Sequence, residues 1–217
     1  MNTGVFFDLD GTLVNGTAGL RFARFLINKK LLQINFDVLI PTLKAFYDFL
    51  TSDVEGYIQG FDTLWALSVK GVKQSKIQYA ALKYAPIEFN NIRKNMLSEL
   101  NNHRRRGHKL FLISASPNEL VSALGKLLSF DYSIGTRLAV RNNVYTSKLR
   151  TPYLTGKDRL VVMRRIAKKF KVSLKDSYAY GNSINDLKVL MAVGHPVAVN
   201  PDAELLTFAR KNGWTII

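Results

Sequence analysis

Two carboxylates stand two residues apart in the segment Asp8-Leu9-Asp10-Gly11-Thr12-Leu13, which directly follows the short apolar run Val5-Phe6-Phe7. An apolar run that stops at a glycine predicts a buried strand that opens into a loop. Carboxylates at this spacing can converge on one metal ion, and a carboxylate held against a bound phosphate can attack it as a nucleophile. The alternative is an acidic turn of the Asp-Gly type that has no chemical role.

Three further stretches place polar side chains at the ends of predicted elements. Ser114 ends the segment Lys109 to Ile113, whose apolar run predicts a strand. Lys157 lies just before the amphipathic segment Asp158 to Phe170, which is predicted to be a helix. The segment Gly181-Asn182-Ser183-Ile184-Asn185-Asp186 follows the predicted strand at residues 178–180.

Taken in order, these four stretches resemble the four motifs of the haloacid dehalogenase superfamily, and the resemblance covers essentially the whole chain. It implies a magnesium-dependent hydrolase of phosphate monoesters that works through a covalent aspartyl-phosphate on Asp8. Asp10 would protonate the leaving oxygen and then activate water, and Lys157 would offset the negative charge of the phosphate. The implied phosphate-binding residues are Thr12, Ser114 and Asn185. The implied ligands of Mg2+ are Asp8, Asp10, Asn182 and Asp186.

Asn182 departs from the family pattern, because the family usually has an acidic metal ligand at this position. The amide oxygen of Asn182 can coordinate magnesium, but it contributes no charge. A second hypothesis therefore stays open, in which the protein is a weakly active or inactive descendant that binds phosphate ligands.

Two other groups of residues have simpler interpretations. Ser116 precedes Pro117 and stands three residues before Glu119, which is typical of a helix start, so Ser116 is predicted to cap a helix. The three histidines, His103, His108 and His195, lack the spacing of metal ligands and are assigned no role.

The elements that must position these residues alternate between strands and helices from residue 103 to the end of the chain. This pattern predicts an α/β fold with a Rossmann-like, mostly parallel sheet and helices on both faces. Within it, residues 138–140 and 144–149, separated by Asn142-Asn143, predict a hairpin. Between residues 16 and 102, apolar residues recur at three- and four-residue spacings instead. We therefore expect a catalytic core at residues 1–15 and 103–217, with an all-helical cap domain inserted at residues 16–102.

The position of the helical insert resembles the phosphoserine-phosphatase-like branch of the superfamily. Amino-acid phosphatases of that branch usually carry a glutamate shortly after the first motif, whereas this chain has Val14-Asn15-Gly16-Thr17-Ala18 there. The expected substrate is therefore a small phosphorylated metabolite other than phosphoserine. The insert is rich in aromatic residues, which leaves phospholipid head groups as an alternative substrate class.

The chain carries a formal net charge of +15, from 31 Lys and Arg against 16 Asp and Glu. Such a balance favours phosphorylated, nucleic-acid or anionic-lipid partners. No recognised nucleic-acid module accompanies the charges, so nucleic acid is not expected as a partner, and neither is a membrane surface. Without cysteine, disulfides and thiolate metal sites are excluded, and no apolar run has the length of a membrane span. We expect a cytoplasmic protein.

Overall fold

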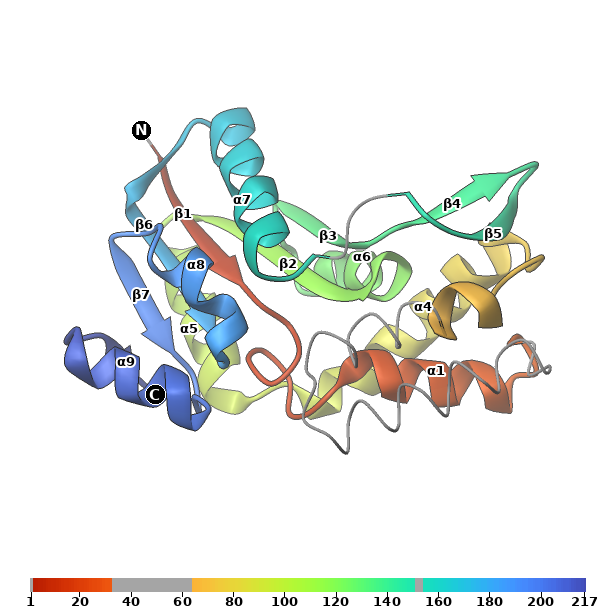
Figure 1. Cartoon of the computed structure of the whole chain (residues 1–217), viewed down its shortest axis with the longest axis horizontal. Coiled ribbons are helices and arrows are strands. Elements are labelled where there is room, and N and C mark those ends of the chain that lie inside the picture. Colours follow the sequence, from red (N-terminus) through yellow and green to blue (C-terminus); the bar gives the residue numbers. More distant parts are fainter. Residues whose placement is uncertain (1, 33–63, 151–153) are drawn as a thin grey trace.

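Six strands form the central sheet, in the order β3-β2-β1-β6-β7-β8, and all neighbouring pairs are parallel (Figure 1). The computed structural model describes residues 2–32, 64–150 and 154–217. The strands of this sheet are β1 (Asn2–Phe7), β2 (Lys109–Pro117), β3 (Tyr132–Thr136), β6 (Val172–Gly181), β7 (His195–Ala198) and β8 (Thr215–Ile216). The predicted parallel α/β sheet is confirmed.

The predicted hairpin is also present. Strands β4 (Leu138–Arg141) and β5 (Val144–Leu149) pair antiparallel in a separate two-stranded sheet. Asn142 and Asn143 connect them with positive φ angles of 51° and 61°, the conformation that a tight two-residue hairpin turn requires.

Helices cover both faces of the sheet because successive residues of its strands point in opposite directions. Val5 and Phe7 belong to one buried cluster, while Phe6 belongs to the cluster on the other face. The first cluster takes in α5 (Lys94–Arg105) and α6 (Asn118–Leu127), and the second takes in α7 (Gly156–Phe170), α8 (Leu187–Leu190) and α9 (Ala203–Lys211). Short 3-10 turns, η1 (Phe89–Asn91) and η2 (Ile184–Asp186), lead into α5 and α8.

The described part of the predicted insert is helical. It contains α1 (Ala18–Asn28), the helical residues 64–68 and α4 (Gln74–Glu88). Phe22 and Trp65 are buried there, and the ring centroids of Phe22 and Tyr84 lie 5.4 Å apart. The other aromatic residues that suggested a ring-bearing substrate lie mostly at 36–61, outside the described residues. Helix α5 continues past residue 102, and the division into core and cap domains stays a prediction.

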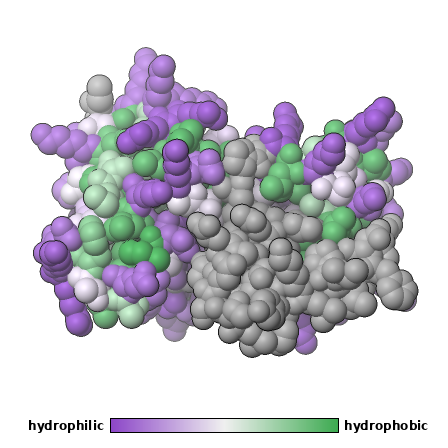
Figure 2. Space-filling model, in the orientation of Figure 1, coloured by the Kyte–Doolittle hydropathy of each residue, from purple (hydrophilic) through white to green (hydrophobic). Residues whose placement is uncertain are grey.

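Several of the basic side chains are exposed on α7. Arg164, Arg165, Lys168 and Lys169 are exposed on this helix, and hydrophilic side chains project from the surface above it (Figure 2). In the residues described, no helix has the length and apolar character needed to cross a membrane.

A buried histidine joins α5 to β6. His103 is 3% exposed; its Nε2 lies 2.8 Å from the Tyr180 hydroxyl, and its Nδ1 lies 2.9 Å from Nδ1 of His108. The Tyr180 hydroxyl donates to Glu99, so His103 donates from Nε2 and accepts a hydrogen bond at Nδ1 from His108. Burial lowers the pKa of His103 to about 4, and the neighbouring positive charges of His108 and Arg106 add to this effect.

The buried His103 should make the stability of the fold sensitive to acid. Between the ordinary His pKa of 6.5 and about 4, the unfolded chain binds a proton at residue 103 that the folded protein does not. The free energy of unfolding should therefore fall as the pH drops through this window. Urea unfolding at a series of pH values should show a flatter pH dependence for His103→Gln than for the wild type. His195→Gln, which changes an exposed histidine, is the control and should keep the wild-type slope. Equal slopes for His103→Gln and the wild type would contradict the prediction.

Candidate active site

Asp8 lies at the carboxyl end of β1, the strand between β2 and β6, so the loops after three neighbouring strands meet around it. The residue is only 7% exposed. Its Oδ2 accepts a hydrogen bond from the Thr12 hydroxyl at 3.0 Å, and its Oδ1 lies 3.0 Å from Nη1 of Arg159. Burial raises the pKa of the Asp8 carboxyl, and the Arg159 guanidinium opposes that rise. Asp8 is a buried carboxylate whose charge is offset by a cation.

Asp10 has a different environment, made of neutral donors. Its Oδ1 accepts a 2.6 Å hydrogen bond from the backbone N–H of Ala18, where α1 begins. Its Oδ2 accepts hydrogen bonds from the hydroxyls of Ser116 at 2.6 Å and Ser114 at 3.3 Å. Burial raises the pKa of Asp10, which suits a group that has to carry a proton during a reaction.

The loop after β6 is held by Asp186, which is 3% exposed. Its Oδ2 accepts hydrogen bonds from the backbone N–H groups of Asn182 at 2.9 Å and Ser183 at 3.1 Å. Its Oδ1 is hydrogen-bonded to Nη1 of Arg159. The Thr12 hydroxyl lies 3.0 Å from Oδ1 of Asn182 as well as from Asp8, so it connects the first loop to this one.

Gly11 allows this close approach of the two loops. Its φ is +75°, and a Cβ atom added there would lie 2.4 Å from Nδ2 of Asn182. A side chain at this position would meet both the strain of the left-handed conformation and the side chain of Asn182.

Arg159, rather than the predicted Lys157, is the basic residue of α7 that reaches the carboxylates. The Arg159 side chain is 8% exposed, and its Nε donates to the backbone oxygen of Leu154 at 3.1 Å. Lys157 is exposed and makes no hydrogen bond or ion pair within the described part of the chain. The reason is helical periodicity: Arg159 is four residues before the buried Met163, whereas Lys157 is rotated by about 200° from Arg159. An arginine in phase with the apolar face was the signal in the sequence.

Ser116 also has a different role from the one expected. Helix α6 has Pro117 at its N-cap without a side-chain hydrogen bond, so the prediction that Ser116 caps this helix is wrong. Ser116 belongs to β2, and its hydroxyl points to Asp10. Asn185, in η2, is half-buried and makes no hydrogen bond to other residues that the structure describes.

One network of hydrogen bonds and ion pairs thus joins most of the predicted site residues. Its members are Asp8, Asp10, Thr12, Ser114, Asn182 and Asp186, together with the unpredicted Ser116 and Arg159. Lys157 and Asn185 do not join it. The network lies at the carboxyl ends of β1, β2 and β6, where the sequence predicted a site.

The oxygen atoms of this network are of the chemical type that binds a divalent cation. Oδ1 of Asp8 and Oδ1 of Asp186 contact the same nitrogen of Arg159, so both already converge on one positive charge. Carboxylate and amide oxygens are the ligands that magnesium prefers in proteins, and Asn182 adds an amide oxygen nearby. Both carboxylate oxygens of Asp10 are turned instead toward Ala18 and the two serines. Among the described residues, no group of three or more His, Asp or Glu side chains forms a metal site.

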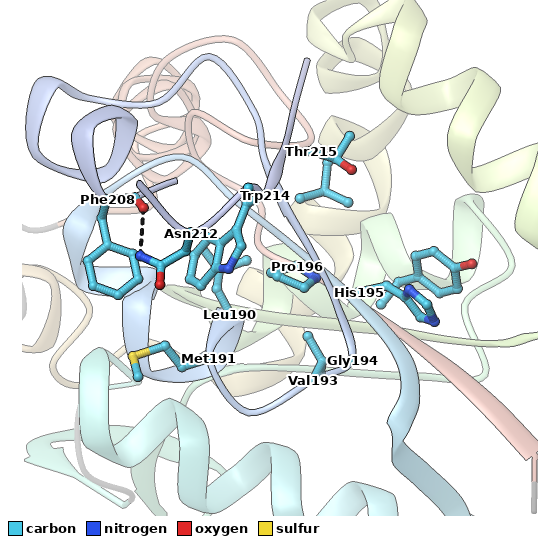
Figure 3. Close-up of a pocket in the computed structure, with 13 residues that line it drawn as sticks. Leu190, Met191, Val193, Gly194, His195, Pro196, Phe208, Asn212, Trp214 and Thr215 are labelled. Atoms are coloured by element: carbon cyan, nitrogen blue, oxygen red, sulfur yellow. Dashed lines mark hydrogen bonds between the residues drawn. The ribbon is translucent and has the colours of Figure 1, made fainter. Parts of the chain in front are cut away.

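A cavity of about 560 Å³ lies elsewhere, at the amino ends of β7 and β8 (Figure 3). Its lining includes Met191, Phe208 and Trp214, with His195 at one end. Among the described residues, its lining contains no carboxylate, and it is at the opposite edge of the parallel sheet from Asp8. The arrangement of charged groups therefore places the candidate chemistry at the Asp8 network.

The family model described as haloacid dehalogenase-like hydrolase matches residues 5–191, and the chain belongs to this family. A protein named phosphoserine phosphatase SerB1 from Mycobacterium tuberculosis is 27% identical over 219 residues, which cover 100% of this chain and 70% of that protein. Histidinol-phosphatase from Neisseria meningitidis is 25% identical over 224 residues, which cover 100% of this chain and 99% of that protein. A solved structure of a protein of unknown function from Bordetella pertussis has the same fold, with a TM-score of 0.85 at 18% identity and coverage of 100% and 98%.

The contact between Gly11 and Asn182 can be tested by a matched pair of substitutions. Gly107 has a similar φ of +72° but nothing within 4 Å of an added Cβ. Gly107→Ala should therefore lower the free energy of unfolding only by the cost of the left-handed conformation, about 1–2 kcal/mol. Gly11→Ala should lower the free energy of unfolding further, because the side chain of Asn182 must also move. Urea unfolding of both variants checks this, and equal losses would show that the contact with Asn182 carries no energy.

Proposed function

We propose that this protein is a phosphatase that hydrolyses a small phosphate monoester through an aspartyl-phosphate on Asp8, with magnesium as its cofactor. The observation that supports this most directly is the contrast between two carboxylates two residues apart. Asp8 is paired with the cation of Arg159, and Asp10 is surrounded by hydroxyl and N–H donors. The first environment suits a nucleophile and the second a proton carrier.

The two carboxylates divide the reaction into two steps. A carboxylate oxygen of Asp8 attacks phosphorus, the bond from phosphorus to the leaving oxygen breaks, and Asp10 gives its proton to that oxygen. Water then attacks the phosphorus of the aspartyl-phosphate, Asp10 takes a proton from the water, and inorganic phosphate leaves with the Asp8 carboxylate restored. The raised pKa of Asp10 supports its part, since a carboxyl that is protonated at the start can act as the acid.

The remaining residues offset the charge of the phosphate. A phosphate dianion is repelled by a carboxylate nucleophile, so positive charge and hydrogen-bond donors are needed around it. We assign the cationic role to Arg159 in place of Lys157, and donor roles to Thr12 and Ser114. Asp8, Asp186 and Asn182 would hold magnesium, which supplies further positive charge beside the phosphate.

A second candidate is a phosphate-binding protein with little turnover. Asn182 favours it, because the metal shell lacks the charge of a third carboxylate and Arg159 already neutralises part of the other two. Magnesium-dependent turnover that needs Asp8 separates the two candidates.

The substrate is proposed to be a small phosphorylated metabolite other than phosphoserine, with phospholipid head groups as the alternative. Residues 14–18 carry no carboxylate that could pair with an ammonium group. Glu88, which could otherwise supply one, is fully buried and paired with Arg21. The relatives with phosphatase names support the reaction class and leave this choice to experiment.

Replacing the two carboxylates one at a time tests the proposed reaction. Asp8→Asn should abolish magnesium-dependent hydrolysis of p-nitrophenyl phosphate, because an amide is a poor nucleophile. Asp10→Asn should lower kcat by about 10²- to 10⁴-fold, the usual contribution of a general acid or base. Circular dichroism of both variants is the control for folding. Wild-type activity in Asp8→Asn would refute the mechanism, and a wild-type protein without turnover would favour the second candidate.

The assignment of the cation is tested by comparing the two basic residues of α7. Arg159→Lys keeps a positive charge, but one ammonium cannot contact Asp8 and Asp186 and also replace the hydrogen bond from Nε to the backbone oxygen of Leu154, so activity should fall substantially. Lys157→Met changes an exposed residue of the same helix and should keep most of the activity. If Lys157→Met loses as much activity as the Arg159 variant, then Lys157 moves into the site during turnover and the assignment is wrong.

A further inference from the structure

Arg21 lies beside the candidate active site, on the helix that Asp10 anchors. Helix α1 begins at Ala18, whose N–H donates to Asp10, and Arg21 follows three residues later on the same side of the helix. Its Nη1 donates to the backbone oxygen of Asn15 at 2.8 Å, so the guanidinium lies over the loop that follows Asp10. Hydrogen bonds with Glu88 raise the pKa of Arg21, and the charge of Asp10 contributes to the rise.

Glu88, at the end of α4, holds this guanidinium in a fixed orientation. Its two carboxylate oxygens accept from Nε, at 3.1 Å, and from Nη2 of Arg21. Oε2 of Glu88 also accepts from the Tyr84 hydroxyl at 2.7 Å and from the side-chain amide of Asn91 at 3.4 Å. Because Glu88 is 0% exposed, its negative charge is buried behind the arginine.

The donors of Arg21 are only partly used by this arrangement. A guanidinium has five N–H donors, and within the described residues Glu88 accepts two of them and Asn15 accepts one. With respect to this part of the chain two donors are left, one on Nη1 and one on Nη2, and 33% of the side chain is exposed. A positively charged pair of donors is therefore held rigidly next to the loop that carries Asp8 and Asp10.

We propose that Arg21 binds a second anionic group of the substrate, an oxyanion on the part of the molecule that leaves with the ester oxygen. The inference rests on the proposed phosphatase function and narrows its substrate class. Two N–H donors of one guanidinium match the oxygens of a carboxylate or of a second phosphate. An ammonium group at the same place would be repelled by the arginine, and the buried Glu88 could not reach it.

The competing explanation is structural, since the ion pair between Arg21 and Glu88 also fastens α1 to α4. A purely structural role would alter the thermal stability and would reduce the hydrolysis of all substrates alike. A binding role changes the preference among substrates. The two explanations therefore differ in a ratio of kcat/KM values.

Four two-carbon phosphate esters supply that ratio. Phosphoglycolate carries a carboxylate, ethanediol bisphosphate a second phosphate, 2-hydroxyethyl phosphate a neutral hydroxyl and phosphoethanolamine an ammonium group. The wild type should prefer at least one of the two anionic esters over the neutral one by about ten- to a hundredfold in kcat/KM, and should use the ammonium ester least. Whichever anionic ester is preferred identifies the second group as a carboxylate or a phosphate.

The variants remove the donors without leaving a buried charge unpaired. Arg21→Gln combined with Glu88→Gln takes away both partners and should lose most of the preference, while Arg21→Lys should retain part of it. Arg24→Gln removes the same charge from an exposed position of the same helix and should keep the preference. Melting temperatures of all variants report the structural contribution separately.

If the wild type hydrolyses the neutral ester with the same kcat/KM as the two anionic esters, the inference is overturned while the phosphatase function stays intact. An unchanged preference in the double variant, even with a lower melting temperature, would overturn it too. If the wild type hydrolyses none of the four esters or p-nitrophenyl phosphate, the proposed function fails and the inference fails with it.

Discussion

The burial of acidic side chains at one edge of the sheet is the constraint on which the rest of the site depends. Asp8 and Asp186 are buried and Asp10 is half-buried, and an isolated carboxylate that is shielded from water is strongly destabilising. Their partners differ. Arg159 pairs with both Asp8 and Asp186, backbone N–H groups also donate hydrogen bonds to Asp186, and hydroxyl groups donate to Asp10. The parallel order β2-β1-β6 brings these partners together, because the carboxyl ends of the three strands are neighbours.

Different neighbours give the same chemical group two functions. Burial raises the pKa of both carboxyls, but next to Asp8 the Arg159 cation opposes this rise and favours the charged, nucleophilic form, whereas the groups that contact Asp10 are neutral donors. Both carboxylates come from one loop, and the glycine between them and Thr12 lets Asn182 approach closely. The same loop ends at α1, whose Arg21 is oriented by the buried Glu88. Thus one short segment carries the proposed nucleophile, the proton carrier and the start of the proposed recognition helix.

Local patterns in the sequence predicted much of the fold. The apolar run before Asp8, the Asn142-Asn143 turn and the alternation of strands and helices each depend on neighbouring residues, and the structure has all three elements. The order of the four motifs also placed Asp8, Thr12, Ser114 and Asp186 at one edge of the sheet.

The sequence was less informative where the contact of a side chain depends on two elements that are distant in the chain. Ser116 has the local signature of a helix cap, yet its hydroxyl bonds Asp10, which is more than a hundred residues away in the chain. Lys157 fits the motif order, but the phase of α7 directs Arg159 inward instead. That phase could have been recognised from the spacing of Arg159 and Met163. The contact of Ser116 could not, because it requires the register between β1 and β2.

Detection of phosphate on Asp8 tests the central claim most directly. The protein would be mixed with a phosphate ester and magnesium, quenched in acid during turnover, and digested for mass spectrometry. The account predicts one phosphoryl group on the peptide that contains Asp8, and its loss in Asp8→Asn. Continued hydrolysis with no phosphoryl group on that peptide, or with the group on another residue, would contradict it.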